Sequence, residues 1–360
     1  MFRPAPRASG YFRTDYAQDL ALLQTQTERV GLAVFAVFAV TLPFIAGPFV
    51  LDLACQVFMA SVGALSLMLL TGYAGQISLG HAGLIAAGAF TTGILARETG
   101  APFWITLPAS ALTGIVLGLI FGLPSLRLRG LYLAVSTLAL HFIVIYLGGE
   151  YETKRGFSTG ILIDPPSLFG VRLTNGRAWY FALLAAAVLS LLICINLLRS
   201  RSGRAWRALH ARETVAEALG INVAGYKLLV FVVSSSMTSV AGCLFAYYRG
   251  FVSIEAFDLF LSIQYVAMII IGGMGSLLGA LLGAVFVTIF PYLIEALLAQ
   301  LPNVQKLAGD IFAVNYASFG LVMILFLIFE PLGLVGIWRR VQNYFLLWPF
   351  KYRPLAGTRK

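Results

Sequence analysis

Charged side chains are scarce in this sequence: Asp, Glu, Lys and Arg together make up 11% of its 360 residues. Soluble domains carry about 25% charged residues, so the shortage argues against a water-soluble protein. Hydrophobic residues instead make up 59% of the chain, and the mean hydropathy is +0.88. The apolar stretches are roughly 20 residues long, the length of a transmembrane helix rather than of a barrel strand. We therefore expect an all-α polytopic membrane protein.

Negatively charged residues are scarcer than positively charged ones. The chain has 15 Asp and Glu against 25 Lys and Arg, which gives a net charge of +10. Basic residues collect in the cytoplasmic loops of membrane proteins, so this excess does not by itself indicate nucleic-acid binding. The acidic residues near expected membrane ends are Asp52, Glu150, Glu295, Asp310 and Glu330. For an ionisable residue in mid-membrane the sequence offers only His81 and His141. Ion-coupled carriers more often have a carboxylate in mid-membrane, which disfavours a stand-alone secondary carrier but leaves it open.

Motifs for catalysis and for metal binding are also lacking. No GxxxxGK[ST] phosphate loop, HExxH or GxSxG motif occurs, so we expect no ATP hydrolysis by this chain and no enzyme activity. The three cysteines, Cys55, Cys194 and Cys243, lie in separate apolar segments without disulfide or metal spacing. We interpret them as small packing residues and expect no metal or cofactor.

Ten apolar runs predict a bundle of about ten transmembrane helices. They cover residues 30–50, 51–70, 84–98, 103–123, 131–149, 178–198, 228–249, 262–282, 284–300 and 311–330. The stretch 262–300 is ambiguous, because it fits either two crossings or one crossing plus a re-entrant piece.

Basic loops set the expected orientation and the division of the chain. Arginines cluster at 127–129, at 199–212 and after residue 338, and all three sites are cytoplasmic if both termini are inside. We expect residues 150–177 and 250–261 outside. The predicted parts are a cytoplasmic tail (1–29), a membrane domain (30–338) containing a cytoplasmic loop (199–227), and a basic cytoplasmic tail (339–360).

Residues 71–90 combine many glycines with polar side chains inside an otherwise apolar chain. A bilayer offers no water to loose backbone, so an opened helix is tolerated only inside protein or along a cavity. We interpret this stretch as a broken helix on a transport path. Its His81 fits three roles: a hydrogen bond to an exposed carbonyl, contact with substrate, or relay of a proton.

A second glycine cluster at 270–279 echoes the first, since Gly72-x-x-Gly75-Gln76 matches Gly272-x-x-Gly275-Ser276. Paired glycine-interrupted helices indicate an internal repeat and a substrate path, and the relation between the copies is either parallel or inverted. The residues predicted to line the path are Gly72, Gly75, Gln76, Ser78, Gly80, His81, Gly272, Gly273, Gly275 and Ser276.

Two further glycine series are spaced four residues apart. They are Gly114, Gly118 and Gly122, and Gly275, Gly279 and Gly283. This spacing places glycines along one helix face, which lets two helices pack closely.

The loop 199–227 is amphipathic and predicts two short helices on the inner face of the membrane. Ser202 is a candidate cap for the first, whose apolar side carries Trp206 and Leu209. Thr214-x-x-Glu217 has the spacing of a capping box, and Gly220 is a candidate C′ residue for the second helix. The pattern favours a preformed docking element for a protein partner, while binding to anionic lipid alone is the alternative.

With these motifs in view, the chain resembles the LivM-type permease subunit of high-affinity branched-chain amino acid ABC importers. The resemblance spans about residues 50–345. The pieces that carry it are GYAGQISLGHAGLIAAGAF at 72–90, RLRGLYLAVSTLAL at 127–140, AEALGIN at 216–222, IIGGMGSLLGALLGA at 270–284 and FEPLGLVGIWRR at 329–340.

The resemblance implies a permease that works with other proteins in a bacterial inner membrane. These are a second, LivH-like permease subunit, two cytoplasmic ATP-binding subunits and a periplasmic amino-acid-binding protein, with lipid around them. The loop at 203–220 would dock on an ATPase. The candidate contact residues are Arg204, Arg207, Glu213, Glu217, Ala218 and Gly220. Departures such as GFSTGI at 156–161 leave urea, short amides or aromatic acids as alternative substrates.

Overall fold

The computed structural model describes residues 26–126, 130–157, 160–168, 171–298 and 311–347. Long helices follow the ten apolar runs. They are α2 (Gln26–Ile45), α3 (Pro48–Leu67), α4 (His81–Thr99), α5 (Phe103–Ser125), α6 (Leu131–Arg155), α7 (Gly176–Arg199), α10 (Val223–Arg249), α11 (Leu259–Gly272), α12 (Leu277–Leu298) and α14 (Ile311–Phe329).

Shorter elements connect these helices. The helical ones are the π-helix η1 (Met68–Tyr73), α8 (Arg201–Ala211), α9 (Glu213–Ala218), the 3₁₀-helix η2 (Ile254–Phe257) and α15 (Gly333–Leu347). The strands are β1 (Ile161–Leu162), β2 (Ser167–Leu168), β3 (Val171–Arg172) and β4 (Phe251–Val252). β1 pairs with β4 and β2 with β3, both antiparallel. The predicted all-α polytopic class is confirmed.

The number of helices able to cross a bilayer is lower than the ten predicted. Among the described residues, seven helices are long and apolar enough, or eight if the bent pair α14–α15 counts as one span. The apolar part of α2, Val30–Ile45, is shorter than a full span. Polar residues such as Thr91, Thr92 and Arg97 lower the hydropathy of α4. Both segments were predicted to cross.

The ambiguous stretch 262–300 forms two helices, α11 and α12, separated by residues 273–276. The predicted end of the helix at residue 282 was therefore wrong, because α11 ends at Gly272. The glycines at 272–275 end one helix and start the next, although the residues on both sides are continuously apolar.

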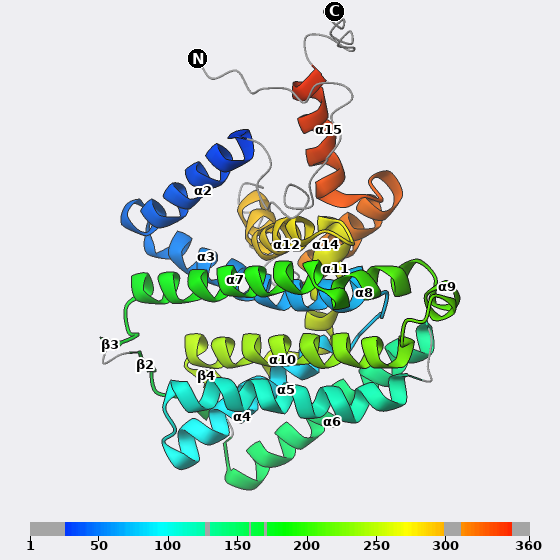
Figure 1. The fold of residues 1–360 in the computed structure, drawn as a ribbon. Helices are drawn as coiled ribbons and strands as arrows, with labels where there is room; N and C mark the ends of the chain where they lie inside the picture. Colours follow the sequence, from blue (N-terminus) through cyan, green and yellow to red (C-terminus); the bar gives the residue numbers. More distant parts are fainter. Residues whose placement is uncertain (1–25, 127–129, 158–159, 169–170, 299–310, 348–360) are drawn as a thin grey trace, which may run out of the picture.

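Several of the long helices run roughly parallel, which gives this part of the bundle two ends. Figure 1 shows α7, α10 and α5 lying roughly parallel, with α8 and α9 at one end and β2, β3 and β4 at the other. We call these the α8 end and the β end. In the same view α2 and α15 extend away from this row of helices. The bend between α14 and α15 is 53°.

Helix α3 lies in the interior, where it packs against α7, α10 and α12. The most apolar window of its span is 78% buried. Hydroxyl groups link it to α10: Ser66 Oγ lies 2.9 Å from Thr238 Oγ1, and Ser234 donates to the Ser66 carbonyl at 2.8 Å. These contacts give the hydroxyl groups hydrogen-bond partners, which the surrounding apolar side chains and lipid cannot supply.

The predicted glycine packing face of α5 is confirmed, and so is that of Gly279 and Gly283 in α12, whereas Gly275 of the second series lies before α12, outside the helix. A Cβ on Gly114 would lie 2.5 Å from the Ser235 carbonyl oxygen, and one on Gly118 3.0 Å from Val232 Cα, so α5 packs closely on α10. A Cβ on Gly279 would lie 2.5 Å from the Gly273 carbonyl oxygen. The second glycine series thus joins α12 to α11 within one hairpin.

Candidate functional site

The first glycine cluster breaks a helix, as predicted. Helix α3 widens into the π-helix η1 and ends at Tyr73, and regular helix resumes only at His81. Gly75 has φ 71°, a left-handed conformation that favours glycine. The turn is closed by the Gln76 amide, which donates to the Leu70 carbonyl at 3.0 Å, and by Thr71 Oγ1, which donates to the Gln76 carbonyl at 2.9 Å.

Neighbouring helices supply partners to the non-helical backbone between η1 and α4. The Leu79 amide donates to Thr137 Oγ1 of α6 at 2.9 Å, and the Ala82 amide donates to Ser262 Oγ of α11 at 2.9 Å. Gly80 packs directly against the Thr137 carbonyl. This backbone is therefore embedded in protein, the condition under which a membrane tolerates it.

The polar side chains of this segment are buried. Gln76, Ser78 and His81 have exposed fractions of 4%, 2% and 1%. Gln76 Nε2 donates to the Lys227 carbonyl at 3.4 Å. The His81 ring lies 4.7 Å from the Tyr265 ring and hydrogen-bonds to the backbone of Gly63. Gln76 Oε1 and His81 Nε2 have no hydrogen-bond partner among the described residues.

The second cluster forms a tighter break. Gly273 and Gly275 have φ 118° and 76°. Ser276 Oγ accepts a hydrogen bond from the Gly279 amide at 3.3 Å and so caps the start of α12. On its other side Gly273 packs against Leu332, at the bend between α14 and α15.

The two breaks lie against each other, although they are far apart in the sequence. A Cβ on Gly72 would lie 3.0 Å from the Gly275 amide nitrogen, and one on Gly275 would lie 3.6 Å from the Gly72 carbonyl oxygen. Farther along the same helices, Gly63 of α3 packs against the Tyr265 ring of α11. Both helices therefore run in the same direction before they break, as a parallel relation between the two copies requires.

A cleft of about 240 Å³ opens where the breaks meet. It is lined by Gly72, Tyr73, Arg207, His210, Met274 and Gly275. His210 belongs to α8, and its Nδ1 would lie 3.0 Å from a Cβ on Gly75. The surface loop thus touches the first break directly. Neither Arg207 nor His210 was predicted to face the breaks, since this contact joins segments distant in the sequence.

The predicted pair of short helices is present in this loop as α8 and α9, but two of the predicted caps were wrong. Ser200, not Ser202, precedes α8, because the chain is extended at Ser200 and helix resumes at Arg201. Arg212, not Thr214, precedes α9. Gly220 has φ 79° and follows the end of α9, as predicted. Trp206 is buried, and its Nε1 donates to the Tyr226 carbonyl at 3.0 Å.

Three of the predicted docking residues are engaged within the chain. Arg204 Nη1 donates to the Arg199 carbonyl at 3.1 Å, and Arg207 Nη2 donates to the Leu198 carbonyl at 2.6 Å. Glu213 forms an ion pair with Lys227 at 2.5 Å.

The other three predicted docking residues, Glu217, Ala218 and Gly220, are exposed. The sequence reading missed two apolar neighbours, Val215 and Leu219, which are 50% and 74% exposed. They lie four residues apart, Val215 within α9 and Leu219 at its C-terminal cap, and this helical spacing was visible in the sequence.

These features define a polytopic helical membrane protein in which two glycine-broken helices meet beside a surface loop. The family model described as "Branched-chain amino acid transport system / permease component" matches residues 49–329, and the chain belongs to this family. Within this family, the chain is similar to permeases of the LivM type.

Three relatives illustrate this similarity. The high-affinity branched-chain amino acid transport system permease protein LivM of Salmonella typhimurium is 32% identical over 339 residues, 88% of this chain and 76% of that protein. The Escherichia coli protein of the same name is 31% identical over the same shares. The probable branched-chain amino acid transport permease protein LivM of Methanocaldococcus jannaschii is 27% identical over 63% of this chain and 66% of its own. No solved structure matches the chain.

Proposed function

We propose that this chain is the membrane-spanning permease subunit of an ABC importer that moves branched-chain amino acids into the cell. The observation that carries the proposal is the contact between the Gly72 and Gly275 breaks, beside a cleft that α8 also lines. Paired broken helices mark the substrate route in transporters. The family and the names of the relatives supply the substrate class.

The α8 end is the cytoplasmic end in this proposal. Arginines at 199, 201, 204, 207 and 212 all belong to the chain around α8, and Arg339 and Arg340 lie in α15. Such an excess of arginine is typical of cytoplasmic loops. Both termini then lie inside, in the inner membrane of a bacterium, and the β end faces the periplasm.

The glycine breaks act as a gate rather than as a tight binding site. Gly72, Gly75, Gly80, Gly272, Gly273 and Gly275 contribute backbone, while Gln76, Ser78, His81 and Ser276 contribute polar groups. In this structure the polar side chains of the first break are buried in protein, so substrate passes only after helices move. A lining of small uncharged groups suits a zwitterion with an apolar side chain.

Energy enters through partner proteins. Two ATP-binding subunits hydrolyse ATP in the cytoplasm, a second permease subunit completes the pore, and a periplasmic protein delivers the amino acid. α9 presents Val215, Glu217 and Leu219 to an ATPase. α8 then transmits the movement to the gate through the contact of His210 with Gly75.

Reconstitution of the purified complex in liposomes tests the proposal. We expect labelled leucine to accumulate only when the ATPase subunits, ATP and the binding protein are present, while labelled urea does not accumulate. Uptake should persist when the proton gradient is collapsed and ATP is kept. A chain that transports without ATPase partners, or only with a proton gradient, would be a secondary carrier and would contradict the proposal.

A further inference from the structure

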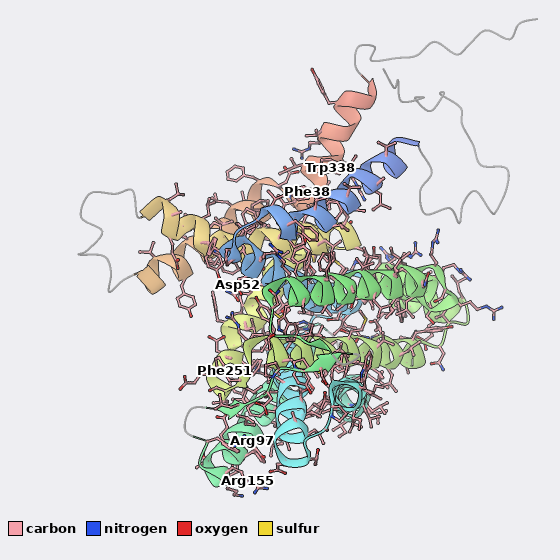
Figure 2. The ribbon with its side chains drawn as sticks, turned by 90° about the vertical axis from the view of Figure 1, so that its left-hand side faces the viewer. Phe38, Asp52, Arg97, Arg155, Phe251 and Trp338 are labelled. Carbon is pink, nitrogen blue, oxygen red and sulfur yellow. The ribbon has the colours of Figure 1, made fainter. Side chains whose placement is uncertain are left out.

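A carboxylate lies near the start of a membrane span, at the β end of the bundle. Asp52 belongs to the span Pro48–Tyr73, about 6 Å along the helix axis from Pro48. Figure 2 shows Asp52 where α3 begins, on the same side of the molecule as Phe251 of β4. None of the roles assigned to the gate or to α8 and α9 uses this residue.

Three neutral side chains hold the carboxylate in place. Gln56 Nε2 donates to Asp52 Oδ2 at 2.7 Å, and the Tyr248 hydroxyl donates to Asp52 Oδ1. The Tyr292 hydroxyl donates to Gln56 Oε1 at 3.2 Å. The four residues come from α3, α10 and α12, so the arrangement depends on the packing of three helices.

Aromatic neighbours fix the two tyrosines. The Trp179 ring lies 5.6 Å from the Tyr248 ring at 86°, and the Phe49 ring lies 5.7 Å from the Tyr292 ring at 82°. Edge-to-face contacts of this kind are favourable and directional. The hydroxyl groups therefore reach the Asp52–Gln56 pair from preset positions.

Among the described residues, no basic side chain forms an ion pair with Asp52, whereas Glu98 and Glu330 each pair with an arginine. Neutral donors leave the negative charge of a carboxylate uncompensated, and each oxygen retains a free lone pair. Asp52 is also exposed rather than sealed in the core. The cluster is therefore arranged to accept a cation from outside the chain.

The cluster and the glycine gate lie along the same pair of helices. α3 and α12 contact each other, with Gln56 and Tyr292 at the β end and Gly72 and Gly275 at the α8 end. Asp52 and the gate thus lie at opposite ends of the same pair of helices.

We propose that Asp52, held by Gln56 and Tyr248, binds the protonated amino group of the incoming amino acid at the periplasmic mouth of the path. A carboxylate with free lone pairs and no basic partner matches a primary ammonium group, which donates three hydrogen bonds. This inference rests on the proposed function. It adds a recognition site on the permease itself, separate from the gate.

The test compares variants of the full reconstituted complex with two competitors of leucine uptake. 3-Methylbutylamine keeps the ammonium group of leucine and lacks its carboxylate, while 4-methylpentanoate has the reverse. We expect only the amine to inhibit uptake by the unmodified complex. Asp52→Asn should weaken that inhibition about tenfold, the effect of losing one hydrogen bond to a charged group. Asp52→Glu should restore it.

Asp164→Asn is the matched control, since Asp164 is exposed in the chain that connects α6 and α7. It should leave uptake and inhibition unchanged. Should Asp52→Asn fail to assemble, Gln56→Leu offers a second variant, expected to weaken amine inhibition about fivefold. Equal amine inhibition of the unmodified and variant complexes would overturn the inference. An unmodified complex that takes up no leucine would instead overturn the proposed function.

Discussion

Glycines with the same left-handed backbone differ in what surrounds them, and this separates their roles. Gly75 has φ 71° and lies against His210, whereas Gly100 at the end of α4 has φ 62°, and a Cβ added there would meet no atom within 4 Å. A non-glycine residue in this conformation costs roughly 1–2 kcal/mol. Both glycines are thus required by the backbone, but only Gly75 joins the gate to α8.

We therefore expect Gly75→Ala and Gly100→Ala to lower the melting temperature by similar amounts, since each introduces about 1–2 kcal/mol of strain. Gly75→Ala should also reduce leucine uptake, because its Cβ would lie 3.0 Å from His210 Nδ1. Adding His210→Ala should relieve the clash but should not recover uptake, because it also removes the contact through which α8 moves the gate. Thermal unfolding and liposome uptake measure the two effects, and equal uptake by both alanine variants would refute the role of the contact.

The glutamates of α9 also differ in role. Glu213 pairs with Lys227, whose side chain is only 8% exposed, while Glu217 is exposed. Removing one partner of a buried ion pair costs about 3–5 kcal/mol, and the partial exposure of Glu213 favours the lower value. We expect Glu213→Gln to lower the melting temperature clearly and Glu217→Gln to leave it unchanged. Lys227→Met added to Glu213→Gln should recover stability, and a double variant as unstable as the single one would contradict this pairing.

At the scale of elements, α9 is a helix too short to be stable alone, so its shape depends on its attachments. Ala216 is buried, Glu213 binds Lys227, and Gly220 ends the helix with φ 79°. These contacts leave one face free, with Val215 and Leu219 exposed. The element is preformed for a partner, which lowers the entropy cost of docking.

Charge reversal on this face should separate docking from folding. We expect Glu217→Arg to insert normally but to uncouple ATP hydrolysis from leucine uptake, because it reverses the charge beside the apolar pair. Leu219→Ser should reduce the amount of ATPase that co-purifies. Leu162→Ser is the control, since Leu162 is 66% exposed in β1 at the opposite end. Normal coupled transport by Glu217→Arg would count against α9 as the docking element.

At the scale of the whole molecule, local sequence patterns predicted the local structure. Apolar runs predicted the helices, and the glycine clusters predicted both breaks. The contact of Gly72 with Gly275, and that of Gly75 with His210, could not be predicted because each joins segments distant in the chain. The start of α8 was also mispredicted: the helix begins at Arg201, directly after the turn at Ser200, so Ser202 lies inside its first turn.

Topology is the property of the whole chain that a labelling experiment can decide. The three native cysteines are buried, so they should react slowly with a membrane-impermeant maleimide. Asp164→Cys lies at the β end and His210→Cys at the α8 end, and both native residues are exposed. We expect intact cells to label position 164, and position 210 to react only in inverted vesicles, because arginines around α8 hold that end in the cytoplasm. Leu219→Cys, also exposed, should follow position 210. Labelling of 164 and 210 from the same side would exclude the proposed orientation and, with it, the docking of α9 on a cytoplasmic ATPase.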